Sequence, residues 1–153
     1  MTEGITYRNP LAKTQITNAQ AADLKVSTYH FLCFENEQEA IDQANYFAEY
    51  AEELGLSKNT VVVNDAEAPV LIPVDATKVS VYFKKQLEAR GYNNIIHHAS
   101  ASWFNNNWME YDVLGKDNSW VAKWPADPSA DQLLYNDTAA SDLKGGLKAI
   151  DSR

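Results

Sequence analysis

The sequence predicts an α/β fold with a mainly parallel sheet, in a single domain that spans residues 1–153. Apolar runs rich in β-branched and aromatic residues recur along the chain, and amphipathic segments with helical periodicity lie between them. Strands that alternate with helices in this way form βαβ units, whose strands run parallel. The length of 153 residues is enough to bury one hydrophobic core, and the sequence contains no internal repeat and no linker.

The first half of the chain predicts helix, strand and helix in that order. Asn9 is expected to cap the first helix, with Pro10 at the first helical position, where its missing N–H costs nothing. The run "VSTYHFLCF" at 26–34 predicts a buried strand. The segment 35–55 predicts a helix, because acidic residues crowd its first turn, one face is apolar and Gly55 stands at its end.

The second half repeats the alternation. The valine-rich run "VVVNDAEAP" at 61–69 predicts a strand, and the segment 77–90 predicts a helix that ends at Gly91. The runs 93–100 and 119–125 predict two further strands, with a short aromatic helix after Ser100 or Ser102. A weakly patterned tail follows the last of these strands.

Composition excludes several classes of function. The net charge is −8, and no cluster of Lys and Arg stands out, so nucleic acid is not an expected partner. Cys33 is the single cysteine, which rules out an internal disulfide, and no spacing of Cys and His indicates zinc. The first residues lack the apolar core of a signal peptide, and no apolar run reaches the roughly 20 residues of a membrane span. We therefore expect a protein that is synthesised in the cytoplasm and has no membrane partner.

The carboxylates of Asp65 and Glu67 are the strongest candidates for chemistry. In a strand they point to the same face, with α-carbons about 6.6 Å apart, so both carboxyl groups can approach one substrate atom. The pair fits acid/base chemistry on a sugar, in which one carboxyl group is protonated and the other ionised. Two other interpretations are a solvated strand end and a metal site completed by histidines, although no known metal-ligand spacing is present.

Histidines and aromatic residues supply the other candidates. His30, His97 and His98 lie toward the ends of predicted strands, where parallel sheets gather their functional groups. The other interpretation of His30 is a core histidine that is hydrogen-bonded to a backbone carbonyl. His97 and His98 must point to opposite faces, so at most one of them faces a cleft. The four tryptophans Trp103, Trp108, Trp120 and Trp124 serve either core packing or a sugar-binding groove.

Five segments carry a resemblance to a known family. "TEGITYRNP", "AADLKVSTYHF", "VVVNDAEA", "ASASWF" and "WVAKWP", in this order and spacing, resemble the family 25 glycoside hydrolases. These are the Chalaropsis-type lysozymes, common among phage and prophage endolysins of Gram-positive bacteria. The likeness runs from residue 2 to about residue 130.

The resemblance implies a muramidase on a flattened β/α barrel, which hydrolyses the β-1,4 bond between N-acetylmuramic acid (MurNAc) and N-acetylglucosamine (GlcNAc) in peptidoglycan glycan strands. It implies Glu67 as general acid and Asp65 as the partner carboxylate that stabilises the substrate's N-acetyl group or the oxocarbenium-like charge. No metal and no organic cofactor are expected. Together with the strand-end residues, it gives six expected substrate-binding side chains: Tyr29, His30, His98, Trp103, Trp120 and Trp124.

The departures from the family pattern predict an incomplete, truncated TIM-like barrel. The chain starts at the "TEG" segment, so we expect it to lack the first β-α-β unit and the aspartate that this unit contributes. Asp151 is only a doubtful match to the last aspartate of the family, and His97–His98 stands where the family generally has an aromatic residue. A complete barrel needs about 200 residues or more. We expect the exposed edges to be covered by a homodimer, by exchanged elements or by the tail.

Three functions follow from these observations. The first is a muramidase that acts on the bacterial cell wall if it is released. The second is a weakened or inactive prophage remnant that binds cell-wall glycan. The third is a metal-dependent polysaccharide deacetylase-like hydrolase that uses the histidines.

Overall fold

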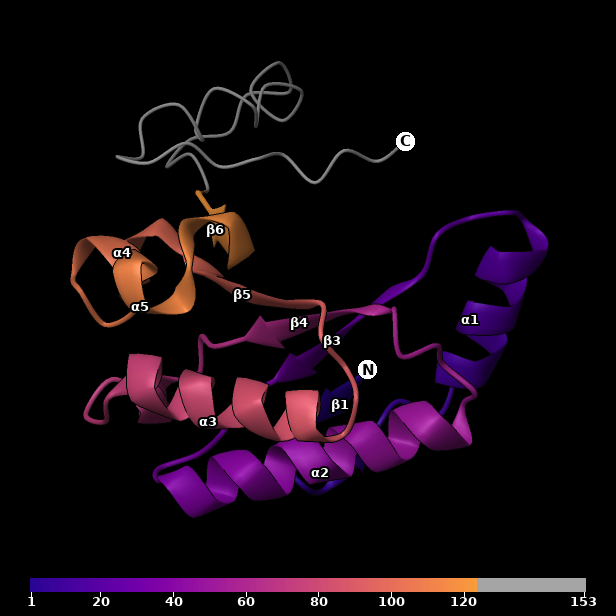
Figure 1. The fold of residues 1–153 in the computed structure, drawn as a ribbon, viewed down its shortest axis with the longest axis horizontal. Helices are drawn as coiled ribbons and strands as arrows, with labels where there is room; N and C mark the ends of the chain where they lie inside the picture. The colour runs from indigo at the N-terminus through magenta and orange to yellow at the C-terminus, as the bar shows by residue number, and fades with distance from the viewer. Residues whose placement is uncertain (124–153) are drawn as a thin grey trace.

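The computed structural model describes residues 1–123 and contains a six-stranded sheet (Figure 1). The strands lie in the order β2-β1-β3-β4-β5-β6, and every neighbouring pair is parallel except the antiparallel pair β1 and β2. Their bounds are β1 Thr2–Glu3, β2 Tyr7–Arg8, β3 Ser27–Phe31, β4 Val61–Asp65, β5 Ile95–Ser100 and β6 Ser119–Ala122. The expected α/β fold with mainly parallel strands is confirmed. Within residues 1–123 the sheet is open between its edge strands β2 and β6, in keeping with an incomplete barrel.

Two long helices cover one face of this sheet. Helices α2 and α3 pack against each other along the same side of the central strands (Figure 1). Each begins at a side-chain cap: Asn36 accepts from the Glu39 N–H, and Asp75 accepts from the Lys78 N–H. The helices and 3₁₀ turns are α1 Ala12–Ala21, α2 Glu37–Glu53, η1 Pro69–Leu71, α3 Ala76–Ala89, α4 Ala101–Asn105, α5 Tyr111–Leu114 and η2 Lys116–Asn118.

Helix α1 begins later than the sequence predicts. Its N-cap is Leu11 rather than Asn9, and Pro10 lies outside the helix. The Asn9 side chain instead accepts from the Leu11 N–H at 3.0 Å, and its carbonyl accepts from the Ala12 N–H at 3.1 Å. An Asn–Pro pair favours turn formation. The capping residue of the prediction therefore forms the turn that precedes the helix.

The remaining differences concern short elements. Strands β1 and β2 were not predicted, because two residues show no periodicity, and neither were α5 and the 3₁₀ turns. Strand β4 ends at Asp65, so Glu67 lies two residues beyond it. Strand β6 ends at Ala122 rather than 125, and Trp124 lies outside the described residues.

The glycines expected after the long helices are confirmed: Gly55 and Gly91 have φ of 71° and 88°.

A row of polar side chains runs across the sheet beneath the helices. Thr2, His30, Asn64, His97 and Ser119 are register partners on five neighbouring strands, and all are buried. His30 stacks on Phe83 of α3 with ring centroids 5.2 Å apart. Burial lowers the pKa of His30 to about 4 and that of His97 to about 3. Both rings are therefore neutral at physiological pH.

Among residues 1–123, no such long helix covers the opposite face of the sheet. The next row of register partners, Glu3, Phe31, Asp65, His98 and Trp120, lies on this open face and is half-buried or exposed. The period of two in a strand separates these side chains from the buried row. No helix among the described residues has the length and apolar character that a membrane span requires. The fold therefore presents a polar and aromatic row on its open face.

Candidate active site

The two carboxylates of the sequence motif lie together on the open face. Asp65 is the last residue of β4, and the chain beyond it stays bonded to its neighbours: Leu32 N–H donates to the Asp65 carbonyl, and Ala66 N–H donates to the His98 carbonyl, both at 3.0 Å. Ala66 and Asn64 are fully buried, whereas Asp65 and Glu67 are half-buried. The alternation of a strand therefore extends to Glu67 and places both carboxylates on one side, as the sequence predicts.

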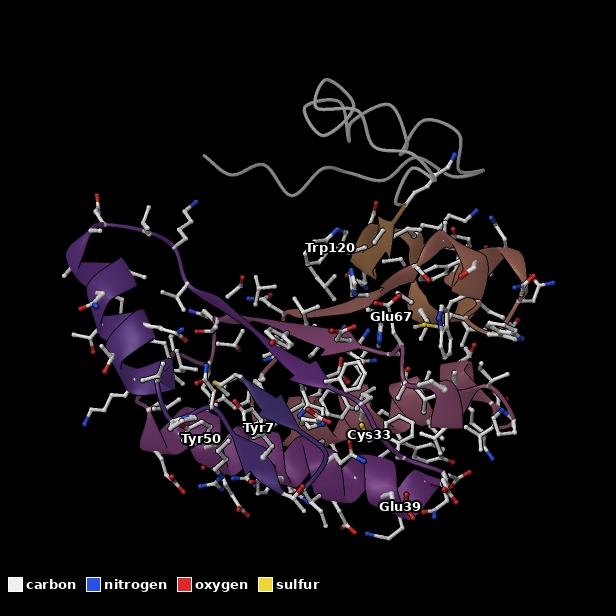
Figure 2. All side chains as sticks on the ribbon, turned by 180° about the vertical axis from the view of Figure 1, so that it is seen from behind. Tyr7, Cys33, Glu39, Tyr50, Glu67 and Trp120 are labelled. Carbon is white, nitrogen blue, oxygen red and sulfur yellow. The ribbon has the colours of Figure 1, made fainter. Side chains whose placement is uncertain are left out.

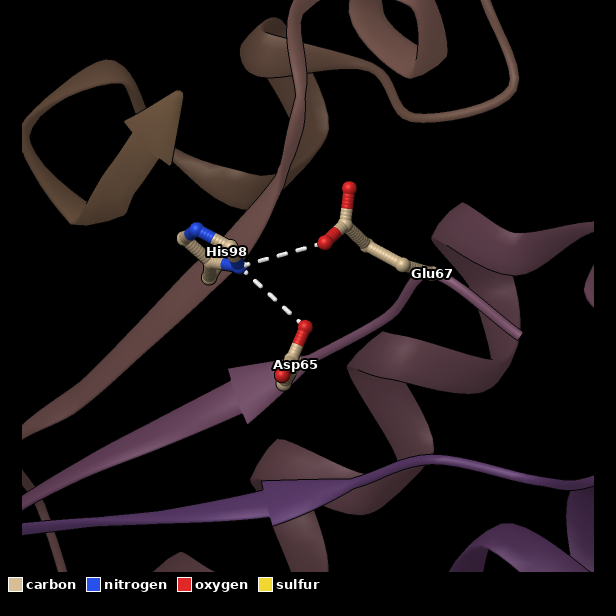
Figure 3. A group of neighbouring side chains, drawn as sticks. All are labelled: Asp65, Glu67 and His98. Atoms are coloured by element: carbon tan, nitrogen blue, oxygen red, sulfur yellow. Dashed lines mark hydrogen bonds and ion pairs between the residues drawn. The ribbon is translucent and has the colours of Figure 1, made fainter. Parts of the chain in front are cut away.

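His98 of β5 lies against both carboxylates (Figure 3). Its Nδ1 is 3.1 Å from Oδ1 of Asp65 and 3.9 Å from Oε2 of Glu67. The other Glu67 oxygen, Oε1, accepts from the backbone N–H of Ser100 at 2.6 Å. The side chains of His98, Asp65 and Glu67 are 16%, 20% and 31% exposed. The group is thus hydrogen-bonded from within the protein and still open to a substrate.

The same three side chains form the donor set that a metal site would need. One donor atom from each of Asp65, Glu67 and His98 lies within 4.8 Å of the others. A carboxylate and imidazole set of this kind suits several divalent cations. His30 and His97, the other histidines considered for a metal site, lie in the buried row on the opposite face. The geometry also accommodates acid/base chemistry without a metal, because each carboxylate already has a hydrogen-bond partner in the protein.

Aromatic side chains flank the carboxylates. Trp120 of β6 is 47% exposed, and its ring contacts His98 edge-on with centroids 4.5 Å apart. Figure 2 shows Trp120 and Glu67 on the side of the sheet away from α2 and α3. Tyr29 is 53% exposed and lines a hollow of about 320 Å³ together with Phe31 and Asp65. Exposed aromatic faces beside carboxylates suit a sugar-binding surface.

Two of the predicted site residues in the described part of the chain are not part of this group. His30 is fully buried on the helix-covered face, where its ring contacts Thr2 and Gln43. Trp103 is only 6% exposed and packs against Trp108 with ring centroids 5.3 Å apart. Trp124 lies outside the described residues. The structure therefore brings together Asp65, Glu67, His98 and Trp120, with Tyr29 at the adjoining hollow.

Two groups that contribute to the site were not predicted from the sequence. Phe31 is the register partner of Asp65, and its position two residues after Tyr29 was the available signal for a shared face. The backbone N–H of Ser100, which holds Glu67, carries no side-chain signal. Its role depends on the register of β4 and β5, and the sequence does not specify that register.

The comparisons with known proteins identify one family. The model of the family described as "Glycosyl hydrolases family 25" matches residues 1–141. The resemblance drawn from the sequence is confirmed by this match. A search among curated proteins gives no match to the chain.

Solved structures of similar fold include bacterial and phage enzymes. The modular autolysin LytC from Streptococcus pneumoniae has a TM-score of 0.69 at 17% identity, and the match covers 82% of this chain and 31% of that protein. The catalytic domain of endolysin ply40 from bacteriophage P40 of Listeria monocytogenes has a TM-score of 0.66 at 18% identity, with 84% and 64% covered. The Streptococcus pneumoniae virulence factor GHIP, a glycosyl hydrolase 25, has a TM-score of 0.66 at 18% identity, with 82% and 56% covered. This chain thus spans less than two thirds of the length of each structure.

Proposed function

This chain belongs to glycosyl hydrolase family 25, and we propose that it is a peptidoglycan-cleaving glycosidase of the N-acetylmuramidase type. The observation that carries the proposal is the pair of carboxylates on one face, with one oxygen of Asp65 and one of Glu67 within 4.8 Å of each other. The bond to be hydrolysed is the β-1,4 link from MurNAc to GlcNAc. A structure of the similar autolysin LytC was solved with a synthetic peptidoglycan ligand, which supports a glycan as substrate.

In this proposal Glu67 is the general acid. It protonates the glycosidic oxygen as the bond to C1 of MurNAc breaks, and the resulting carboxylate then takes a proton from the water that completes hydrolysis. Glu67 is the more exposed of the two carboxylates, and its Oε2 is free of backbone hydrogen bonds among the described residues. Its position suits a group that must reach a bond in the substrate.

Asp65 has the role of the partner carboxylate. The spacing of the two groups is short, as in retaining glycosidases, whereas inverting enzymes keep their carboxyl groups about 6.5–9.5 Å apart to admit a water molecule. Asp65 accepts a hydrogen bond from His98 and remains ionised in this scheme. Its charge stabilises the substrate's N-acetyl group or the positive charge that develops at C1.

A glycan-binding protein without chemistry is the second candidate. The exposed rings of Trp120 and Tyr29 beside the hollow favour it, because they can stack on sugars whether or not the carboxylates react. A metal-dependent deacetylase-like hydrolase would use the donor set of Asp65, Glu67 and His98. Dependence of activity on an added divalent metal would distinguish it from the muramidase.

The test is the clearing of turbid suspensions of Gram-positive cell walls by the wild-type chain and by Glu67→Gln. We expect clearing by the wild type, in the presence of a chelator as well, and none by the variant. Substitution by glutamine keeps the acceptor for the Ser100 N–H while removing the acid. Binding of both proteins to walls without clearing would favour the glycan-binding alternative, and metal-dependent release of acetate without clearing would favour the deacetylase-like one.

Two expectations about the whole protein stay predictions. We propose that the enzyme acts on the cell wall after release from the cell. We also propose that it forms a homodimer that covers the edges of its open sheet. Sedimentation of the purified protein as a stable monomer would contradict the dimer.

A further inference from the structure

Strand β5 presents one hydrogen-bonding nitrogen to each carboxylate of the pair. Asp65 and His98 are register partners. Glu67 and Ser100 each lie two residues further on, and the Ser100 backbone N–H donates to the Glu67 side chain. Asp65 receives a side-chain nitrogen, Nδ1 of His98, and Glu67 receives a backbone nitrogen. One partner is a ring nitrogen and the other is a backbone nitrogen, so the two carboxylates have different hydrogen-bonding environments.

The Ser100 N–H decides where Glu67 carries its proton. A backbone N–H can only donate, so Oε1 of Glu67, at 2.6 Å, must act as acceptor. When Glu67 is in its acid form, the proton therefore belongs on Oε2. This is the oxygen on the side of His98, with Oε2 and Nδ1 3.9 Å apart.

The His98 ring decides the state of Asp65 in the same way. A contact of 3.1 Å between Nδ1 and Oδ1 requires one proton between the two atoms. If Asp65 is to remain ionised beside an acidic Glu67, that proton must belong to Nδ1 of His98. The ring is held by the edge-on contact with Trp120, its own register partner on β6.

We infer that His98 is a positioning residue that gives its Nδ1 proton to Asp65 and thereby keeps Asp65 the carboxylate and Glu67 the acid of the pair. The inference rests on the proposed function for its catalytic consequence but not for its geometry. The resemblance leads us to expect an aromatic residue where this chain has His97–His98, so an imidazole at this place departs from the family pattern.

The first test is spectroscopic and needs no activity. Nitrogen-15 NMR at about pH 8.5, where an ordinary histidine is neutral, reports which ring nitrogen carries the proton. We expect His98 as the Nδ1–H tautomer in the wild type, and a shift toward the Nε2–H tautomer in Asp65→Ala. His98→Asn identifies the signals of His98 by their loss. A wild-type His98 protonated on Nε2 alone would overturn the inference.

The second test is kinetic, on soluble peptidoglycan fragments. His98→Phe keeps a ring beside Trp120 but removes the donor, whereas His98→Asn keeps an N–H near the position of Nδ1. We expect His98→Phe to lower kcat about 10- to 100-fold with little change in KM, and His98→Asn to retain most of kcat. Equal losses in the two variants would contradict a donor role.

The two proposals fail in different ways. A wild-type chain that digests no peptidoglycan but shows the Nδ1–H tautomer would refute the proposed function and leave the proton assignment standing. A chain that digests peptidoglycan with His98 in the Nε2–H tautomer would refute the role of His98 alone.

Discussion

The buried ring of His30 donates its Nε2 proton to Oε1 of Gln43, with the two atoms 3.0 Å apart. The backbone of Cys33 fixes the orientation of this amide, because its N–H donates to Oε1 at 3.1 Å and its carbonyl accepts from Nε2 of Gln43 at 2.7 Å. The His30 proton therefore lies on Nε2, and Nδ1 accepts from the Thr2 hydroxyl at 2.7 Å. One glutamine of α2 thus ties the helix to β3 and sets the tautomer of a core histidine.

Replacement of Gln43 by alanine should destabilise the fold by about 3 kcal/mol, because it leaves the buried His30 donor and both backbone groups of Cys33 unpaired. The exposed Gln38 of the same helix, bonded to Asp42, provides the control, and Gln38→Ala should cost less than about 0.5 kcal/mol. Urea unfolding of the two variants measures the difference. Equal midpoints would show that the buried bonds contribute nothing.

Acid should destabilise the fold through His30 and His97. Both have a pKa lowered by burial, to about 4 and about 3, so the unfolded chain binds protons below about pH 6.5 while the folded chain does not. Stability is then complete above pH 6.5 and falls as the pH drops toward these values. Between pH 6 and pH 5 each histidine should remove about 1 kcal/mol.

The control for the acid effect is a variant in which a buried histidine is replaced by a side chain that cannot titrate. His97→Gln should flatten the dependence of unfolding free energy on pH by about 1 kcal/mol between pH 6 and pH 5, whatever its effect on absolute stability. His30 is present in both proteins, so its contribution cancels in the comparison. Parallel curves for wild type and variant would contradict a buried, neutral His97.

These buried contacts show where prediction from the sequence ends. The pattern "YHF" indicated that His30 was special, but it did not show which face of the sheet the ring occupies. Its partners Thr2 and Gln43 lie 28 and 13 residues away in the chain, and only the packing of β1 and α2 against β3 brings them together. By contrast, the shared face of Asp65 and Glu67 follows from local alternation and could be predicted.

The two tryptophans Trp120 and Trp103 should respond to substitution in opposite ways. Trp120→Ala should weaken binding of an inactive Glu67→Gln protein to peptidoglycan about 2- to 10-fold and cost less than about 1 kcal/mol of stability, because the ring is 47% exposed. Trp103→Ala should cost about 3–5 kcal/mol, because the ring is 6% exposed and packed on Trp108. Thermal unfolding and a wall-binding assay check both values, and equal stability losses would contradict the assignment.

Elements of five or more residues could mostly be predicted, because they are long enough to show a period. Strands β3, β4 and β5 and helices α2 and α3 were expected within a few residues of their observed bounds. Strands β1 and β2 have two residues each and depend on pairing, with Thr2 beside His30 and Arg8. Nη1 of Arg8 also donates to both carboxylate oxygens of Glu53 of α2, at 2.8 and 2.9 Å. No local sequence pattern predicts this contact.

The most direct test of the carboxylate pair is analysis of the sugar ends released from purified peptidoglycan. After borohydride reduction, digests by the wild type should contain newly reduced N-acetylmuramic acid, and digests by Glu67→Gln should contain none. Newly reduced N-acetylglucosamine, released acetate, or equal products from the two proteins would contradict hydrolysis of the MurNAc-β-1,4-GlcNAc bond with Glu67 as acid.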